Sequence, residues 1–190
     1  MWIRRKNMNE KENMLLGQIY NAQDKQLLKE RKRAKELCFK FNNTNPSNYK
    51  RRTNIIKRIV GSVGANCWIE QSFWCDYGYN IEIGENFFAN HNCIILDGAK
   101  VTFGDNVFIG PDCGFYTAGH PLDYERRNKG LEYAYPITVG NNVWIGAGVK
   151  VMPGVTIGDN VVIGAGSVVT KDIPSNKIAY GNPCKVIKDF

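Results

Sequence analysis

Residues 137–169 read ITVGNNVWIGAGVKVMPGVTIGDNVVIGAGSVV, and this stretch decides the fold. Every sixth residue from Val139 onward is Val or Ile, and the residue two places before each of these is apolar except at Ser167. A six-residue period fits neither an α-helix nor a hairpin sheet, but it is typical of hexapeptide β-solenoids. Side chains alternate along a strand, so each short strand can point two of these residues inward. The two series are Val139, Ile145, Val151, Ile157, Ile163 and Val169, and Ile137, Val143, Val149, Val155, Val161 and Ser167.

The repeats predict a stack of triangular coils. Three strands and three corners make one coil of about 18 residues, and glycine suits the corners because it tolerates unusual backbone dihedrals. The same register extends backwards to Ile83-Gly84, Phe103-Gly104 and Ile109-Gly110, with two extra residues between Gly84 and Gly104 that predict a small corner insertion. The predicted fold class is therefore mainly β, a left-handed parallel β-helix over residues 61–190, preceded by a helical segment over residues 1–60.

The cysteines are interpreted as small buried hydrophobic residues rather than as a metal or redox site. No C-x-x-C pair occurs among Cys38, Cys67, Cys75, Cys93, Cys113 and Cys184, and no secretory signal core precedes them, so we expect reduced thiols. Cys75 and Cys93 are 18 residues apart, and Cys93 and Cys113 are 20 apart. That spacing predicts an interior ladder of these three thiols.

Residues from about 9 to 60 show a helical period instead. Apolar residues recur at steps of three and four from Leu27 to Phe41, with Asp24 as the expected N-cap. The run from Asn42 to Pro46 breaks that helix, and a second helix is expected over 47–59. A short helix is expected near residues 10–20, and the first eight residues are interpreted either as a disordered segment or as an extension that precedes the fold.

Charge is distributed unevenly along the chain. Residues 1–60 hold 16 Lys and Arg against 5 Asp and Glu, whereas residues 61–190 hold 9 against 13. A basic segment can bind nucleic acid, or it can be a solvated helical face that also attracts an anionic cofactor. Because no nucleic-acid motif accompanies the charge, the second interpretation is favoured. No apolar run approaches the roughly 20 residues of a membrane span, so we expect a cytoplasmic protein without a membrane partner.

An extended loop over residues 116–136 interrupts the repeats with polar and aromatic residues. A long loop on a rigid scaffold is a common place for a functional site. The chain has only two histidines, His91 and His120, too few for the three-histidine zinc site of solenoid carbonic anhydrases. One histidine suffices as a general base. His120 lies at the start of the loop and is the candidate, while His91 is expected at a coil corner.

Several ordered motifs then carry a resemblance. They are Glu10–Gly17 with Tyr20, Tyr77–Ile81, Asn86–Asn90, Thr117–Pro121, Pro136–Gly146 and Gly164–Pro174. Over about residues 9–189 the chain resembles the maltose, galactoside and nodulation-type O-acetyltransferases of the hexapeptide-repeat superfamily. The resemblance implies acetyl-CoA as co-substrate, a sugar hydroxyl as acceptor, no metal, and a homotrimer. It also implies that each active site lies between two subunits, with His120 from one and the wall around Trp144 from the other.

The resemblance also implies roles for individual residues. His120 would be the catalytic base, and Asn90 would hold the reacting groups near the thioester carbonyl. Residues at cofactor-binding positions are Trp144, Ala147, Ala165, Thr170, Lys171, Lys185 and Lys188. Residues at acceptor-binding positions are Asn21, Asp76, Phe88, Asn90, Asp97 and Glu132.

Three acceptor positions bear on the identity of the sugar. Asn21 stands where many relatives have Asp, and Phe88 stands where the galactoside enzyme has Tyr. Glu132 matches the maltose type. These residues favour a maltose-like or glucose-like acceptor over a galactoside.

Two other functions remain open at this point. A xenobiotic O-acetyltransferase acting on chloramphenicol or a streptogramin would use the same fold and base, although the N-terminal helices resemble those of the sugar enzymes. A non-catalytic β-helix scaffold is the third interpretation, because fold alone does not determine function. The presence of His120, Asn90, Trp144 and Thr170-Lys171 argues against it.

Overall fold

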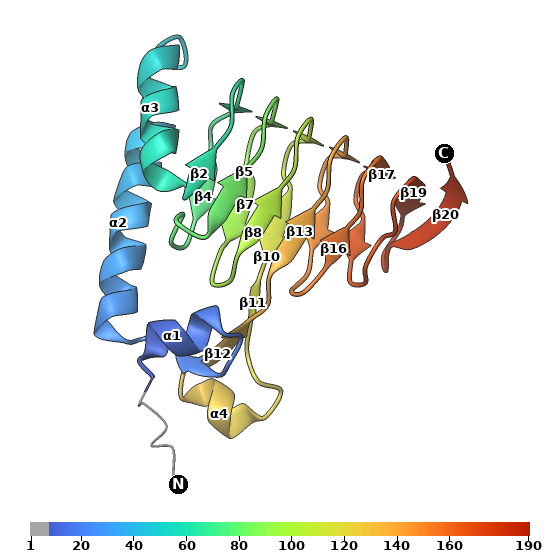
Figure 1. Cartoon of the computed structure of the whole chain (residues 1–190). Helices are drawn as coiled ribbons and strands as arrows, with labels where there is room; N and C mark the ends of the chain where they lie inside the picture. Colours follow the sequence, from blue (N-terminus) through green and yellow to red (C-terminus); the bar gives the residue numbers. More distant parts are fainter. Residues whose placement is uncertain (1–7) are drawn as a thin grey trace, which may run out of the picture.

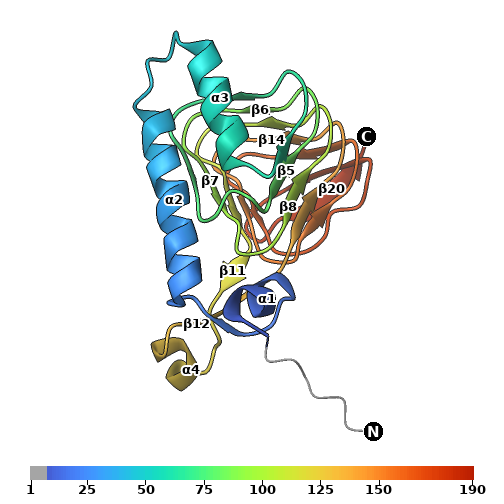
Figure 2. The ribbon, with the colours of Figure 1, turned by 60° about the vertical axis from the view of Figure 1, so that its left-hand side comes forward.

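The structure is a computed structural model, and it describes residues 8–190. A stack of triangular coils forms an elongated prism with helices at one end, and a loop that carries its own small sheet projects from one corner (Figures 1 and 2). The predicted hexapeptide-repeat β-solenoid is confirmed.

Three sheets of mainly parallel strands form the faces of the prism. We name them face B, face C and face D, in the order in which the chain visits them. Face B contains β2 (Ser62–Val63), β5 (Ile81–Ile83), β8 (Val101–Phe103), β13 (Ile137–Val139) and β16 (Thr156–Ile157). Face C contains β3 (Trp68–Ile69), β6 (Phe88–Ala89), β9 (Phe108–Ile109), β14 (Trp144–Ile145), β17 (Val161–Ile163), β19 (Lys177–Tyr180) and β20 (Lys185–Asp189). Face D contains β4 (Phe73–Cys75), β7 (Cys93–Leu96), β10 (Gly114–Tyr116), β15 (Lys150–Val151) and β18 (Val168–Val169).

The inward residues of the repeat form the core that the sequence predicts. All eleven apolar members of the two six-residue series are at most 2% exposed. Ser167, the one polar member, is buried as well and satisfies its hydroxyl by donating to the Gly164 carbonyl at 2.5 Å. Glycine at the corners lets coils approach closely, since a Cβ on Gly146 would lie 2.6 Å from the Ala165 nitrogen.

The helical segment closes one end of this core. Helix α2 (Lys25–Asn42) and helix α3 (Tyr49–Ile59) bury Phe41, Ile55, Ile56 and Ile59 against the first coil, in one continuous cluster with the solenoid. The expected N-cap is confirmed, because the Asp24 side chain accepts hydrogen bonds from Gln26 N and Leu27 N. Because the two parts share this core, the helices are built onto the solenoid rather than standing apart from it.

The short helix expected over residues 10–20 is shorter than predicted. Helix α1 spans Glu10–Leu15 and is stopped by Gly17, which adopts a left-handed φ of 68°. Tyr20–Asn21 instead forms strand β1, which pairs antiparallel with β12. The extension assigned to the first eight residues falls, except for Met8, outside the described residues.

The predicted ladder of three thiols is wrong at one member. Cys93 and Cys113 do stack in register on face D, but Phe73 lies opposite Cys93 and Cys75 lies opposite Ile95. The early coils repeat every 20 residues here, so an 18-residue spacing misses by two positions. Cys75 instead meets Cys38 of α2, with the two Sγ atoms 3.6 Å apart.

The extended loop leaves the prism at the corner between face D and face B. It contains β11 (Ala118–Gly119), α4 (Tyr124–Asn128) and β12 (Leu131–Ala134). Strand β12 lies between β11 and β1 in a three-stranded sheet, so the loop is held against the N-terminal segment (Figure 1). Thr117, fully buried at the base of the loop, donates to the Leu96 carbonyl and accepts from the Ala99 amide.

Within residues 8–190, no helix is both long enough and apolar enough to cross a membrane.

Candidate active site

His120 is held by the loop that carries it. Its Nδ1 lies 2.9 Å from the carbonyl oxygen of Leu131 on β12. A carbonyl oxygen can only accept, so Nδ1 carries the proton and the neutral ring has its lone pair on Nε2. The side chain is 49% exposed, so an incoming hydroxyl can reach that nitrogen. This geometry makes His120 a suitable proton acceptor.

Glu132 lies beside the free nitrogen of His120. Its Oε1 is 3.9 Å from His120 Nε2, and its Oε2 accepts a hydrogen bond from the Tyr20 hydroxyl at 2.7 Å. Tyr20 is 1% exposed, and burial raises the pKa of its hydroxyl above the ordinary value, so Tyr20 stays a donor. The buried Tyr20 therefore holds the Glu132 carboxylate in place, with Oε1 directed toward His120.

Asp76 belongs to the same corner although it comes from another coil. It follows β4 on face D, and the pKa of its carboxyl is raised by burial and by the negative charge of Glu132, while Arg31 and Lys35 act in the opposite direction. Asn21, opposite Leu131 on β1, is exposed at the edge of the loop sheet, and its Oδ1 accepts from Gln23 N. Carboxylates and an amide at this position can bind sugar hydroxyls.

Asp97 is in this corner too, but it is fully buried. Its Oδ1 accepts from the backbone amides of Asp76 at 3.1 Å and Tyr77 at 2.8 Å, and its Oδ2 accepts from Asn80 N at 3.3 Å. Burial raises the pKa of Asp97 to about 7. The structure thus places Asp97 where it orders the backbone that presents Asp76, and not at the surface.

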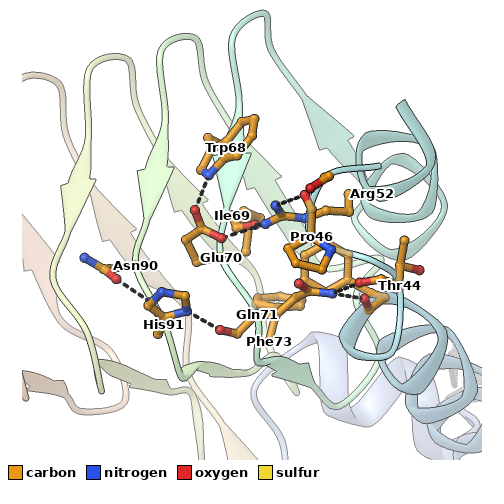
Figure 3. A network of polar contacts seen from close by, with 12 residues as sticks. Thr44, Pro46, Arg52, Trp68, Ile69, Glu70, Gln71, Phe73, Asn90 and His91 are labelled. Carbon is orange, nitrogen blue, oxygen red and sulfur yellow. Dashed lines mark hydrogen bonds and ion pairs between the residues drawn. The ribbon is translucent and has the colours of Figure 1, made fainter. Parts of the chain in front are cut away.

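Asn90 lies at a different corner, between face C and face D. Its Oδ1 accepts from the His91 amide at 2.7 Å, and the His91 ring is bonded to the Gln71 carbonyl (Figure 3). Within residues 8–190 no partner engages the Asn90 Nδ2 group. Asn90 therefore presents an N–H donor that suits a carbonyl oxygen gaining negative charge.

Trp144 is part of an apolar column on the outside of face C. The outward residues of successive strands pair in register and are aromatic or aliphatic on every coil. Phe108 is 51% and Trp144 is 58% exposed. The column consists of Trp68, Phe88, Phe108, Trp144, Val162 and Ile178. Such a patch is typical of a binding or subunit surface.

The predicted cofactor residues lie on the later coils. Ala147 and Ala165 are exposed on the corner between faces C and D, and no hydrogen bond within residues 8–190 engages their N–H groups. Thr170 and Lys171 are exposed on the corner between faces D and B. Lys185 and Lys188 lie on β20, which extends face C. These exposed amides and lysines fit an elongated ligand that carries carbonyl and phosphate groups.

The predicted site residues thus fall into two groups on opposite edges of face D. The loop edge holds Asn21, Asp76, Asp97, His120 and Glu132, with Thr170 and Lys171 further along the prism. Face C and its edge with face D hold Phe88, Asn90, Trp144, Ala147, Ala165, Lys185 and Lys188. One chain therefore does not bring His120 and Asn90 together.

The structure adds a residue that the sequence left without a role. Tyr20 was noted only as part of a motif, yet its hydroxyl binds Glu132, 112 residues away. A Tyr in a short N-terminal segment has no local signal for this contact, because the contact depends on the pairing of β1 with β12. Within residues 8–190, no three His, Cys, Asp or Glu side chains come together as a metal site.

Two family models match the chain. A maltose acetyltransferase hexapeptide capping motif matches residues 13–64, and a bacterial transferase hexapeptide model of six repeats matches residues 136–171. The first covers the helical segment and the second covers the stretch with the six-residue period.

Characterised relatives and solved structures agree with both models. The chain is 48% identical to the galactoside O-acetyltransferase of Escherichia coli K12, over 97% of this chain and 91% of that protein. It is 56% identical to a maltose O-acetyltransferase from Clostridium difficile 630, whose crystal structure matches with a TM-score of 0.96 over 97% of this chain and 99% of the other. A galactoside acetyltransferase in complex with coenzyme A matches with a TM-score of 0.93 at 48% identity, over 96% of this chain and 92% of the other.

Proposed function

The chain belongs to the hexapeptide-repeat acetyltransferases of the maltose and galactoside O-acetyltransferase family, and from this premise we propose that it transfers the acetyl group of acetyl-CoA to a hydroxyl of a sugar. Relatives of this kind act on maltose and galactosides. Glu132 and Phe88 favour a maltose-like or glucose-like acceptor over a galactoside.

The observation that carries the proposal is the His120 ring. With Nδ1 bonded to the Leu131 carbonyl, Nε2 is the atom that takes the proton from the acceptor hydroxyl. The hydroxyl oxygen then attacks the thioester carbonyl carbon, the C–S bond breaks, and His120 returns the proton to the leaving sulfur. No acyl-enzyme is needed, because among residues 8–190 no activated nucleophile lies beside the base.

Asn90 supplies the second catalytic group. Its Nδ2 group would donate to the carbonyl oxygen as negative charge develops there, and the His91 amide keeps the side chain oriented through Oδ1. Asp76, Asn21 and Glu132 would bind acceptor hydroxyls. Asp97, being buried, would act as a positioning residue behind Asp76.

Acetyl-CoA would lie along face C. Trp144 would line its pantetheine arm, the N–H groups of Ala147 and Ala165 would donate to its amide carbonyls, and Lys185 and Lys188 would face its phosphates. Thr170 and Lys171 would contribute from the loop edge of the adjacent subunit.

We further propose a homotrimer with each site between two subunits. His120 and Asn90 lie on opposite edges of face D within one chain, so a second copy is needed to bring them together. The apolar column on face C is the surface that a neighbouring loop edge and the cofactor would cover. We place the enzyme in the cytoplasm, where acetyl-CoA is available and where the six thiols of the chain remain reduced.

The test is release of the CoA thiol from acetyl-CoA in the presence of maltose, glucose, a thiogalactoside or chloramphenicol. Release that depends on both a sugar and His120 is the expected result. Release with chloramphenicol and none with sugars would favour the xenobiotic enzyme. Absence of release with every acceptor, together with no stabilisation by CoA against heat, would favour the non-catalytic scaffold.

Subunit mixing tests the shared site. His120→Ala and Asn90→Ala variants should each be inactive, and co-refolding them in equal amounts should restore about a quarter of the activity, because one site in four then has both groups intact. No recovery in mixed trimers would show that both residues act from one chain.

A further inference from the structure

A shallow groove of about 770 Å³ lies between the outer side of α2 and β4. Three large apolar side chains line it, all exposed: Leu28 at 43%, Phe39 at 61% and Trp74 at 38%. We call it the α2–β4 groove. A cluster of exposed apolar side chains rimmed by charged residues can mark a ligand-binding groove.

The remaining lining of the groove is strongly basic. Arg31, Lys32, Lys35 and Lys40 line it, and Glu36 is the one carboxylate among its lining residues. Part of the excess positive charge of residues 1–60 is thus gathered at one hollow rather than spread over a solvated helix. The acetyl transfer chemistry uses none of these cations.

The groove joins the acceptor corner. Trp74 and Asp76 are two residues apart on β4 and its extension, so both point to the outside of the same sheet. Arg31, which lines the groove, also reaches the acceptor corner, where its Nη1 donates to the Tyr77 hydroxyl at 2.6 Å. Burial raises the pKa of Asp76, and the positive charge of Arg31 acts to lower it. A molecule held at Asp76 can therefore extend onto Trp74.

The acceptor corner and the α2–β4 groove carry charges of opposite sign. The acceptor corner holds Asp76 and Glu132, whereas the groove next to it carries net positive charge. Carboxylates bind neutral hydroxyls and repel anions, while lysines attract a phosphate or carboxylate. One ligand that satisfies both has a neutral sugar ring at one end and an anionic group at the other.

We propose that the acceptor is an anionic glycoside, with its neutral ring at His120 and Asp76 and with a second unit that stacks on Trp74 and places a phosphate or carboxylate between Lys32 and Lys35. This proposal rests on the proposed function for the identity of the reaction. It goes beyond that function in naming the substrate class and a second subsite.

Two matched pairs of sugars test it. Trehalose and trehalose 6-phosphate differ by one phosphate, and maltitol and maltobionate, which both have an open-chain second unit, differ by one carboxylate. We expect the anionic member of at least one pair to bind about tenfold more tightly at low salt, as the paired charges predict, and to lose most of that preference at high salt. Binding is measured by calorimetry without acetyl-CoA, and kcat/KM by thiol release.

Two matched double variants test whether the preference for the anionic sugar depends on the α2–β4 groove. Lys32→Gln with Lys35→Gln should bring the ratio of the anionic to the neutral dissociation constant close to one. Lys25→Gln with Lys29→Gln removes the same charge from exposed positions of the same helix outside the groove, and should keep the ratio of the unaltered protein. Trp74→Ala should weaken binding of both members of each pair.

The outcomes separate the two proposals. Equal binding within both pairs, or a preference that survives Lys32→Gln with Lys35→Gln, would overturn the anionic subsite while leaving sugar acetylation intact. A groove-dependent preference in calorimetry without thiol release would support the subsite and count against the acetyltransferase. A preference for phosphate alone or carboxylate alone would identify the anion.

Discussion

The coils of residues 137–169 and the loop corner of residues 116–136 are neighbours in sequence and follow opposite rules. In the coils, every inward position except Ser167 is a Val or Ile that is almost fully buried, so each residue packs in the same way as the one six places away. In the loop corner no such repeat occurs, and the site side chains His120 and Glu132 are polar, partly exposed and each held by one hydrogen bond. Repetition therefore builds the rigid prism, and the place where repetition stops carries the chemistry.

His120→Ala should give the largest effect, a loss of catalysis in the loop corner without a loss of stability in the coils. Loss of the base should lower kcat by about 10²- to 10⁴-fold, which is the usual contribution of general-base catalysis. Because the ring is half exposed and makes one hydrogen bond to Leu131, the melting temperature should stay within about 1–2 °C. Steady-state kinetics and calorimetry measure the two effects.

His91→Ala is the control for this variant. His91 is exposed at the opposite edge of face D, so its loss should lower kcat less than about tenfold. A comparable loss in both histidine variants would mean that His120 is not the base.

Ile163→Ala should show the opposite profile. Ile163 is completely buried at the end of β17, and truncation leaves a cavity that costs about 2–5 kcal/mol in the free energy of unfolding. The kcat of the folded enzyme should change little. Leu122→Ala, an apolar residue of the loop that is 96% exposed, should cost less than about 0.5 kcal/mol. Urea unfolding of the two variants compares the regions directly, and equal losses would break the contrast.

Asp97→Asn tests the buried charge behind the loop corner. The folded pKa of about 7 lies above that of a free aspartate, about 4, so the folded state holds the proton more tightly. Protonation of Asp97 therefore adds up to about 4 kcal/mol to the free energy of unfolding below pH 4. This contribution is lost as the pH rises from 4 through 7.

In the Asp97→Asn variant the free energy of unfolding should fall less steeply between pH 4 and 7 than in the unaltered protein. Asp76, whose pKa burial also raises, contributes with the same sign, so some slope should remain. Urea titrations at several pH values measure the slope, and an unchanged slope would show that Asp97 is ionised throughout.

Tyr20→Phe should have a smaller effect than the changes at His120, Ile163 and Asp97. It removes the hydrogen bond to Glu132 and should cost about 0.5–1.5 kcal/mol in the free energy of unfolding, since the carboxylate can still be solvated. KM for the sugar should rise by less than about tenfold, because Glu132 loses its fixed orientation. A larger loss of kcat than of acceptor affinity would instead place Tyr20 in the proton transfer.

Much of the site could be predicted from local pattern. His120 was identifiable because the chain has two histidines and one of them lies near the start of the long loop that interrupts the repeats. The two long helices were identifiable from their apolar periods, and α2 also from its Asp24 cap, while the core was identifiable from its six-residue series. The roles of Asn90, Trp144 and the lysines came from the family motifs rather than from any physical signal in the residues themselves.

The sequence by itself determined the six-residue period, and with it the inward columns and the corners of the prism. It also determined the helices that close one end and the loop that carries the candidate base, His120. What the tertiary structure decided is which distant residues meet: Tyr20 with Glu132, Cys75 with Cys38, and Asp97 with the backbone of Asp76. The reason is that the six-residue period determines whether a side chain points into or out of the prism. The number of residues in each coil determines which residue of the next coil stacks on it. Coils here advance by 20, 20, 36 and 18 residues along face B, and only stacking chooses among those lengths. The same stacking places His120 and Asn90 on opposite edges of one face.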